Sequence, residues 1–189
     1  YRTVSTNPCG EIPLCPYDSC RLLAINLYSY VVNPFKPDAY FDFDLFKKHV
    51  ALAQRIMDDI IDLELEKIER IMAKIDSDPE NEDVKHTESV LWQKIYKKSG
   101  QGRRTGVGIT AEGDMLAALG LRYGTEEATE FAEKVHQTVA LSAYRSSVEM
   151  AKERGAFEVY DSEREKNNPF INRLREADPE LYEEMKKYG

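Results

Sequence analysis

Apolar residues recur at spacings of three and four along most of the chain beyond residue 40, and this period commits it largely to helix. Asp42 or Asp44 can cap the first helix. The phase of the pattern slips at residues 63–65, where we expect a break or a bend. The apolar stripe comprises Phe46, Val50, Ala53, Met57, Ile60 and Ile61, and it resumes over Ile68, Ile71, Met72 and Ile75.

Capping and helix-breaking residues predict where the later helices begin and end. We expect a polar loop over residues 77–83, and a second loop at Gly100-Gln-Gly-Arg-Arg. We expect a short helix over residues 87–98, and a second helix that is capped by Thr110 and stops at Gly120. The longest helix is expected over residues 125–154, with Thr125 as its cap. A terminal helix is expected to begin at Asp178-Pro179.

The first forty residues differ from the rest, because five of the eight prolines lie there. Pro8, Pro13 and Pro16 exclude a continuous helix, so residues 6–19 are interpreted as an irregular loop. The apolar run over residues 22–32 then predicts a strand buried on both faces.

Short strands are also expected at residues 106–109 and 157–160. The fold class is therefore α/β and helix-dominated. We interpret residues 1–189 as a single segment, with a loop over 1–21, a buried strand over 22–32 and mainly helices over 42–189.

Composition narrows the class of protein. The chain has 189 residues and a net charge of −8, with 42% hydrophobic and 32% charged residues, which is typical of a globular protein. Its acidity disfavours nucleic acid as a partner, and no apolar run approaches the ~20 residues of a membrane span. Three cysteines are too few for a disulfide scaffold, so we expect the cytoplasm. The start at Tyr1, without Met, predicts a piece of a longer chain.

All three cysteines lie in the proline-rich segment, at Cys9, Cys15 and Cys20. A proline before Cys9 and a glycine after it present that thiol on a stiff, uncrowded turn. Asn7 and Glu11 flank the thiol at −2 and +2, and in an extended loop these positions share its face. A thiol, an amide and a carboxylate would then converge, which supplies a sulfur reactant, a hydrogen-bonding group and a general base.

Other readings of these residues stay open at this point. A cysteine in a loop is more often a small buried hydrophobe than a catalyst. The cysteine spacing is poor for zinc, no histidine is marked as a protease partner, and we predict no metal ligands. Arg103 and Arg104 are more typical of a surface than of a phosphate site.

The Asn-Pro-Cys-Gly-Glu motif resembles the finger loop of the ribonucleotide reductase large chain, most closely the adenosylcobalamin-dependent class II form. Pro-Tyr-Asp-Ser-Cys and Ile-Asn-Leu follow it as in that family, and Arg-Arg-Thr-Gly-Val-Gly and Ala-Lys-Glu-Arg-Gly-Ala-Phe are similar to family stretches further on. The chain departs from the family at Cys20-Arg-Leu-Leu-Ala, where Cys-Asn-Leu-Gly-Ser is expected.

The resemblance implies a role for four residues. Cys9 matches the cysteine that becomes a thiyl radical and takes hydrogen from C3′ of the ribose. Glu11 matches the carboxylate that accepts the 3′-hydroxyl proton, and Asn7 the amide that hydrogen-bonds the ribose hydroxyls. Cys20 matches one of two thiols that reduce the substrate as the 2′-hydroxyl leaves as water. No role carries over to Cys15.

The resemblance also implies the wider setting. The family fold is a ten-stranded α/β barrel, of which this chain would be a segment, and the chain alone is expected to be inactive. Expected partners are a ribonucleotide substrate, a thioredoxin-like reductant and the remainder of the reductase chain, with adenosylcobalamin as cofactor at residues the sequence does not assign. Because residues 22–32 are apolar on both faces and their barrel neighbours would lie outside this chain, we expect the open edge of that strand to pair with a second copy, giving self-association, or with the short strands of this chain. The alternatives are a class I reductase segment and a non-catalytic helical interaction module.

Overall fold

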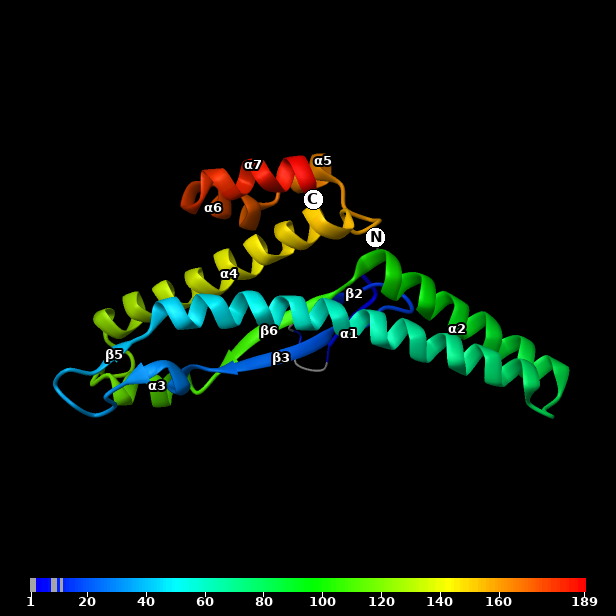
Figure 1. Ribbon diagram of the computed structural model, residues 1–189, viewed down its shortest axis with the longest axis horizontal. Helices are drawn as coiled ribbons and strands as arrows, with labels where there is room; N and C mark the ends of the chain where they lie inside the picture. Colours follow the sequence, from blue (N-terminus) through cyan, green and yellow to red (C-terminus); the bar gives the residue numbers. More distant parts are fainter. Residues whose placement is uncertain (1–2, 8–9, 11) are drawn as a thin grey trace. The chain divides into compact units, whose positions relative to one another are not determined.

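The computed structural model describes residues 3–7, 10 and 12–189 (Figure 1). Helices dominate this part of the chain, as the apolar period predicts. The helices are α1 (Phe43–Ser77), α2 (Glu82–Gly102), α3 (Glu112–Ala118), α4 (Glu126–Arg154), α5 (Ser162–Glu165), α6 (Pro169–Ala177) and α7 (Pro179–Tyr188), with a 3-10 turn at Leu27–Tyr30. The strands are β1 (Ser5–Thr6), β2 (Pro13–Leu14), β3 (Arg21–Asn26), β4 (Val31–Val32), β5 (Tyr40–Phe41) and β6 (Thr105–Thr110).

The strands pair two at a time in the described residues, as β1 with β2, β3 with β6, and β4 with β5. Contacts group the chain into two compact units, and α1 belongs partly to each. Unit 1 comprises the described residues of 1–21, together with 56–106 and 156–160, and unit 2 comprises 22–55, 107–155 and 161–189.

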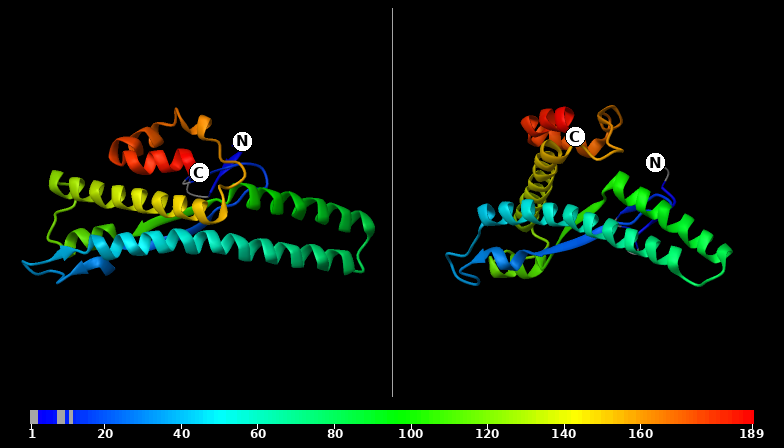
Figure 2. Two further views of the ribbon diagram at one scale, coloured as in Figure 1. Left: turned by 45° about the horizontal axis from the view of Figure 1, so that its top comes forward. Right: turned by 45° about the vertical axis from the view of Figure 1, so that its right-hand side comes forward.

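In unit 1 the second half of α1 and the whole of α2 lie side by side as a helical hairpin (Figures 1 and 2). The Tyr96 hydroxyl of α2 donates to Glu69 Oε1 of α1 at 2.7 Å. Asn81 caps α2 by accepting from the Asp83 N–H. The polar connection predicted between these helices is present, but it is shorter than expected because α2 begins at Glu82.

Helix α1 begins where an aspartate cap was predicted, since Asp42 Oδ1 accepts from the Leu45 N–H at 2.9 Å. The predicted break at residues 63–65 is wrong, and α1 is continuous. Its buried apolar side chains after Ala53 are Met57, Ile61, Ile68 and Ile75, which are four or seven residues apart and so keep one phase. The apparent slip arose from Leu63, which is 63% exposed.

The predicted loop over residues 100–104 is wrong in its first half, because α2 continues through Gly102. The helix ends at Arg103, whose backbone is left-handed with φ 42° and ψ 51°, and whose N–H donates to Ser99 O. Glycine is the usual residue in this conformation. Here the Arg103 side chain is held by ion pairs to Asp58 and Asp62 of α1. These ion pairs offset the free-energy cost of the left-handed backbone at a residue with a Cβ.

The single strand predicted over residues 22–32 is wrong. Strand β3 ends at Asn26, whose side chain accepts from the Tyr28 N–H and starts the 3-10 turn. The turn buries Leu27 and Tyr30, which are three residues apart. Nor is β3 buried on both faces: Leu22 is 56% exposed, whereas Ile25 is buried.

Strand β6 lies where a short strand was predicted, but Thr110 does not cap the helix that follows. Ala111 precedes α3, with a φ of 60° and no side-chain cap. The strand predicted at residues 157–160 is also wrong, because the Tyr160 N–H donates to Phe157 O at 2.9 Å and closes a turn.

Two later helices begin as predicted. Thr125 caps α4, accepting from the Ala128 N–H, and Asp178 caps α7, accepting from the Leu181 N–H. Helix α6 was not predicted, although Asn168 caps it in the same way ahead of Pro169. None of the described helices is long and apolar enough to cross a membrane.

Unit 2 holds two apolar clusters. The larger joins the start of α1 to the 3-10 turn, α3 and α4. The smaller packs α6 and α7 on α4 (Figure 2). The fully or nearly buried members of the larger cluster are Ile25, Leu27, Tyr30, Phe41, Phe46, Val50, Ala53, Met115, Leu116, Ala128 and Val135, and those of the smaller are Val148, Ile171, Leu174, Leu181 and Met185.

Phe46→Ala is expected to lower the free energy of unfolding by about 3–5 kcal/mol, because it leaves a cavity in the larger cluster. Phe46 is fully buried, and its ring lies 4.9 Å from that of Tyr30 and 5.2 Å from that of Phe41, between centroids. The measurement is the urea midpoint. The control is Leu52→Ala on the same helix, where the side chain is 53% exposed. Equal losses in the two variants would contradict this core.

Candidate active site

The segment that carries the thiol motif is a short hairpin rather than the irregular loop predicted. Strands β1 and β2 pair antiparallel with Ser5 opposite Leu14 and Thr6 opposite Pro13. The Val4 N–H donates to Leu14 O at 2.9 Å, and the Asn7 N–H donates to Ile12 O at 3.0 Å. These pairings hold the described residues on the two sides of the motif, Asn7 and Ile12, next to each other.

A turn begins at Asn7, because the Gly10 N–H donates to Asn7 O at 2.8 Å. Gly10 has a φ of 77°, a conformation that glycine adopts without the strain of a Cβ. The Asn7 residue is 9% exposed. The convergence of Asn7, Cys9 and Glu11 stays a prediction. Cys9 and Glu11 lie outside the described residues.

The hairpin is followed by a second turn that leads to Cys20. The Asp18 N–H donates to Cys15 O at 3.2 Å, with Pro16 next in the chain and Tyr17 at a φ of 63°. Proline followed by a positive φ is typical of a type II turn. Lys94 of α2 places its Nζ 5.0 Å from the centroid of the Tyr17 ring, which ties this turn to the helical hairpin.

The structure separates the environments of the two described cysteines. Cys15 is 5% exposed, at the start of the second turn, and Cys20 is half-buried just after it. The Cys20 Sγ lies 3.7 Å from Arg21 O. Both are thiols rather than halves of a disulfide. The buried position of Cys15 agrees with the reading of it as a small hydrophobe.

Two arginines that the sequence did not single out as site residues hold this segment. Arg104 Nε donates to Asp18 Oδ2 at 2.5 Å, and its Nη2 lies 3.8 Å from Cys15 Sγ. Arg21 forms an ion pair with Glu64 of α1 and donates from Nη2 to Ser99 Oγ of α2 at 2.8 Å. The expectation that Arg104 decorates a surface is wrong.

Burial by itself would lower the pKa of the Arg104 guanidinium, but the hydrogen bond and charge of Asp18 outweigh it and raise that pKa. The same balance holds at Arg103, where burial opposes Asp58 and Asp62 and the pKa is raised. Both arginines therefore remain charged throughout the working range of pH, and neither pair is broken by deprotonation of its cation.

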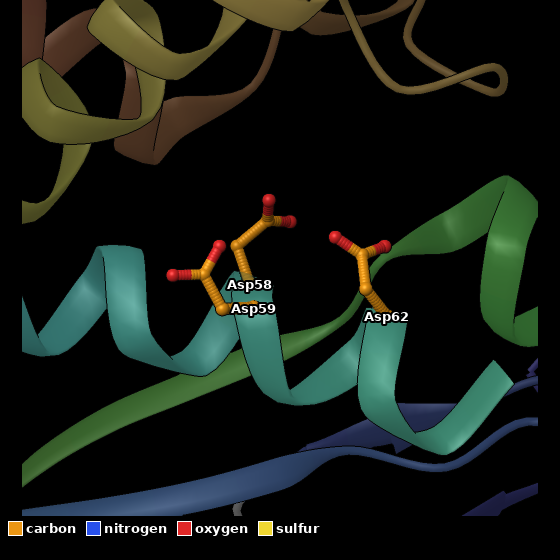
Figure 3. A group of neighbouring side chains, drawn as sticks. All are labelled: Asp58, Asp59 and Asp62. Carbon is orange, nitrogen blue, oxygen red and sulfur yellow. The ribbon is translucent and has the colours of Figure 1, made fainter. Parts of the chain in front are cut away.

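Three carboxylates of α1 lie close together at Asp58, Asp59 and Asp62, with one oxygen of each within 4.8 Å of the others (Figure 3). Arg103 Nε lies 2.7 Å from Asp58 Oδ1, and Arg103 Nη1 lies 2.8 Å from Asp62 Oδ1. A guanidinium thus already occupies the cationic position between two of these groups. We assign the cluster to the anchoring of Arg103.

We assign none of the described residues to a corrin cofactor. Two of the three histidines already have a side-chain partner. His49 Nδ1 lies 3.0 Å from the Tyr30 hydroxyl, and His136 Nε2 lies 3.5 Å from Glu112 Oε1.

Comparison with known proteins matches nearly the whole chain to one protein family. The family model of the ribonucleotide reductase barrel domain matches residues 2–189. The chain is 36% identical over 163 residues to a vitamin B12-dependent ribonucleoside-diphosphate reductase of Thermoplasma acidophilum, and 31% identical over 163 residues to one of Mycobacterium tuberculosis. It is 28% identical over 159 residues to the ribonucleoside-diphosphate reductase subunit alpha of Chlamydia pneumoniae.

These matches cover most of this chain and a small part of each relative. The aligned residues make up 86%, 86% and 82% of the chain, but 18%, 19% and 12% of the three relatives in the same order. The chain therefore spans under one fifth of the length of these relatives.

Proposed function

The chain belongs to the ribonucleotide reductase barrel-domain family, and we propose that it is a catalytic segment of an adenosylcobalamin-dependent reductase that makes deoxyribonucleotides. The observation that carries this proposal is the Asn-Pro-Cys-Gly-Glu motif, which lies in the sequence between the paired strands β1 and β2 of a chain similar to two vitamin B12-dependent reductases. The substrate is a ribonucleotide, and the remainder of the parent chain completes the barrel.

Each site residue has one task in this proposal. The Cys9 thiyl radical takes hydrogen from C3′ while Glu11 accepts the 3′-hydroxyl proton. Asn7 hydrogen-bonds the ribose hydroxyls, and its 9% exposure is suited to a pre-positioned amide. When bound, adenosylcobalamin supplies the radical equivalent that oxidises the thiol, and we place its site in the remainder of the parent.

Reduction of the substrate needs two electrons. Cys20 supplies one of them and a second thiol supplies the other. The 2′-hydroxyl leaves as water, the substrate gains hydrogen at C2′, and the two thiols become a disulfide. A thioredoxin-like reductant then restores both thiols, in the cytoplasm. Inactivity of this chain alone, and its self-association, stay predictions.

The test uses the full-length parent reductase, incubated with a ribonucleotide and a dithiol, with and without adenosylcobalamin. We expect deoxynucleotide only when the cofactor is present. Formation of deoxynucleotide only with a separate metal-containing radical subunit would favour the class I alternative. No deoxynucleotide under either condition, from a folded parent, would favour the non-catalytic module.

A further inference from the structure

We propose that two ion-pair clamps, Asp18–Arg104 and Arg21–Glu64, fix the Cys20 thiol for its reducing step, so that Arg104 and Arg21 are positioning residues. This inference rests on the proposed role of Cys20 as a reductant. Neither arginine touches substrate in the proposal, and both act through the backbone on either side of Cys20.

The first clamp holds the chain just before Cys20. The Asp18 side chain is 1% exposed, and a buried carboxylate needs a partner to compensate its lost hydration. Arg104 supplies that partner from the connection between α2 and β6, with its Nε 2.5 Å from Asp18 Oδ2. The other carboxylate oxygen, Oδ1, accepts from the Ser19 N–H at 3.0 Å. Asp18 is thereby fixed at both oxygens.

The second clamp holds the chain just after Cys20. The Arg21 side chain is 9% exposed and forms an ion pair with Glu64 of α1. Its Nη2 donates to Ser99 Oγ of α2, and its Nη1 donates to Ser19 O at 3.3 Å. Ser99 is itself 1% exposed. One guanidinium thus ties the residue next to Cys20 to both helices of the hairpin.

The two clamps together leave the Cys20 backbone little freedom. Asp18 is two residues before the thiol and Arg21 is one residue after it, so the span between the clamps is about 10 Å at full extension. Reactions of this kind require the reacting atoms to be held about 3–3.5 Å apart. A thiol on a short tether between two fixed points is held near one position by its backbone, which is what that requirement asks for.

The test compares variants of the full-length reductase by two products, deoxynucleotide and free base. If Cys20 is displaced, the 3′ radical still forms but is not reduced, and the nucleotide decomposes with release of its base. We expect the ratio of base to deoxynucleotide to rise about tenfold or more in Arg104→Met, Asp18→Asn and Arg21→Met, since a misplacement of about 1 Å can cost roughly 10²-fold in rate.

Arg103→Met is the matched control. Arg103 is adjacent to Arg104 and of similar exposure, 22% against 29% for the side chains, but its ion pairs are to Asp58 and Asp62 of α1. A general loss of stability would lower both products without changing their ratio. An unchanged ratio in the three clamp variants, or an equal rise in Arg103→Met, would overturn the proposal.

A second measurement decides the question without turnover. The alkylation rate of Cys20 by iodoacetamide, resolved by peptide mass spectrometry, should rise in the clamp variants and stay at the wild-type value in Arg103→Met. An alkylation rate that does not change in the conservative Asp18→Asn variant would overturn the clamp. If the wild-type parent makes no deoxynucleotide, the proposed function fails, and the alkylation rates still decide the clamp.

Discussion

Cys9→Ser in the full-length parent is expected to abolish deoxynucleotide formation, even in a single turnover with a strong external dithiol. In the proposed mechanism the Cys9 thiyl radical is the only group that takes the 3′ hydrogen. An O–H bond is stronger than an S–H bond, so the same cofactor would not form a serine radical. The measurement is deoxynucleotide per enzyme after one cycle with adenosylcobalamin present.

The control for this loss is Cys15→Ser, which is expected to stay close to the wild type. Cys15 is 5% exposed, and the Arg104 Nη2 that lies 3.8 Å from its sulfur could approach a serine hydroxyl equally well. Deoxynucleotide from the Cys9→Ser enzyme, or a Cys15→Ser enzyme that is as inactive, would show that the roles of these cysteines are assigned wrongly.

Glu11→Gln should slow the chemical step by about 10²–10⁴-fold, the usual contribution of a general base. Glutamine keeps the size and hydrogen-bonding capacity of the side chain but does not accept the 3′-hydroxyl proton. We therefore expect the ribonucleotide to bind with unchanged affinity while kcat falls.

The measurements for Glu11→Gln are substrate affinity by equilibrium binding and kcat from deoxynucleotide formation. The control is Glu153→Gln, since that exposed carboxylate pairs with Arg55 in unit 2 and has no part in the hairpin. A kcat within a factor of about two of the wild-type value would show that Glu11 is not the general base.

The local signals for helix termini were read correctly where one side chain decides the outcome. Asp42, Thr125 and Asp178 each cap the helix that was predicted to begin beside them. These caps depend on a side chain and a backbone N–H two or three residues away, so the sequence alone contains the whole interaction.

Two of the errors share a different cause, which is contact between residues far apart in the chain. The α2 terminus at Arg103 is fixed by carboxylates more than forty residues earlier, and no local pattern reveals it. Likewise the run over residues 22–32 is apolar enough for one strand, but burial of Leu27 and Tyr30 in the larger cluster favours a 3-10 turn.

In the candidate site too, features set by neighbours in the chain could be predicted, and features set by distant contacts could not. The motif from Asn7 to Cys20 could be found from the sequence because its residues are neighbours in the chain. The two arginines that hold it could not, since Arg104 is eighty-six residues from Asp18 and Arg21 is forty-three from Glu64. Charge alone does not tell an exposed arginine from one that anchors a buried carboxylate.

The measurement that tests the account most directly is the product distribution of Cys9→Ser and Cys20→Ser parents in one turnover with adenosylcobalamin. The two thiols have different tasks in the proposed mechanism, hydrogen abstraction for Cys9 and reduction for Cys20. We therefore expect neither deoxynucleotide nor free base from Cys9→Ser, but substrate loss with release of free base from Cys20→Ser. Free base from Cys9→Ser, or an intact substrate with Cys20→Ser, would contradict that mechanism.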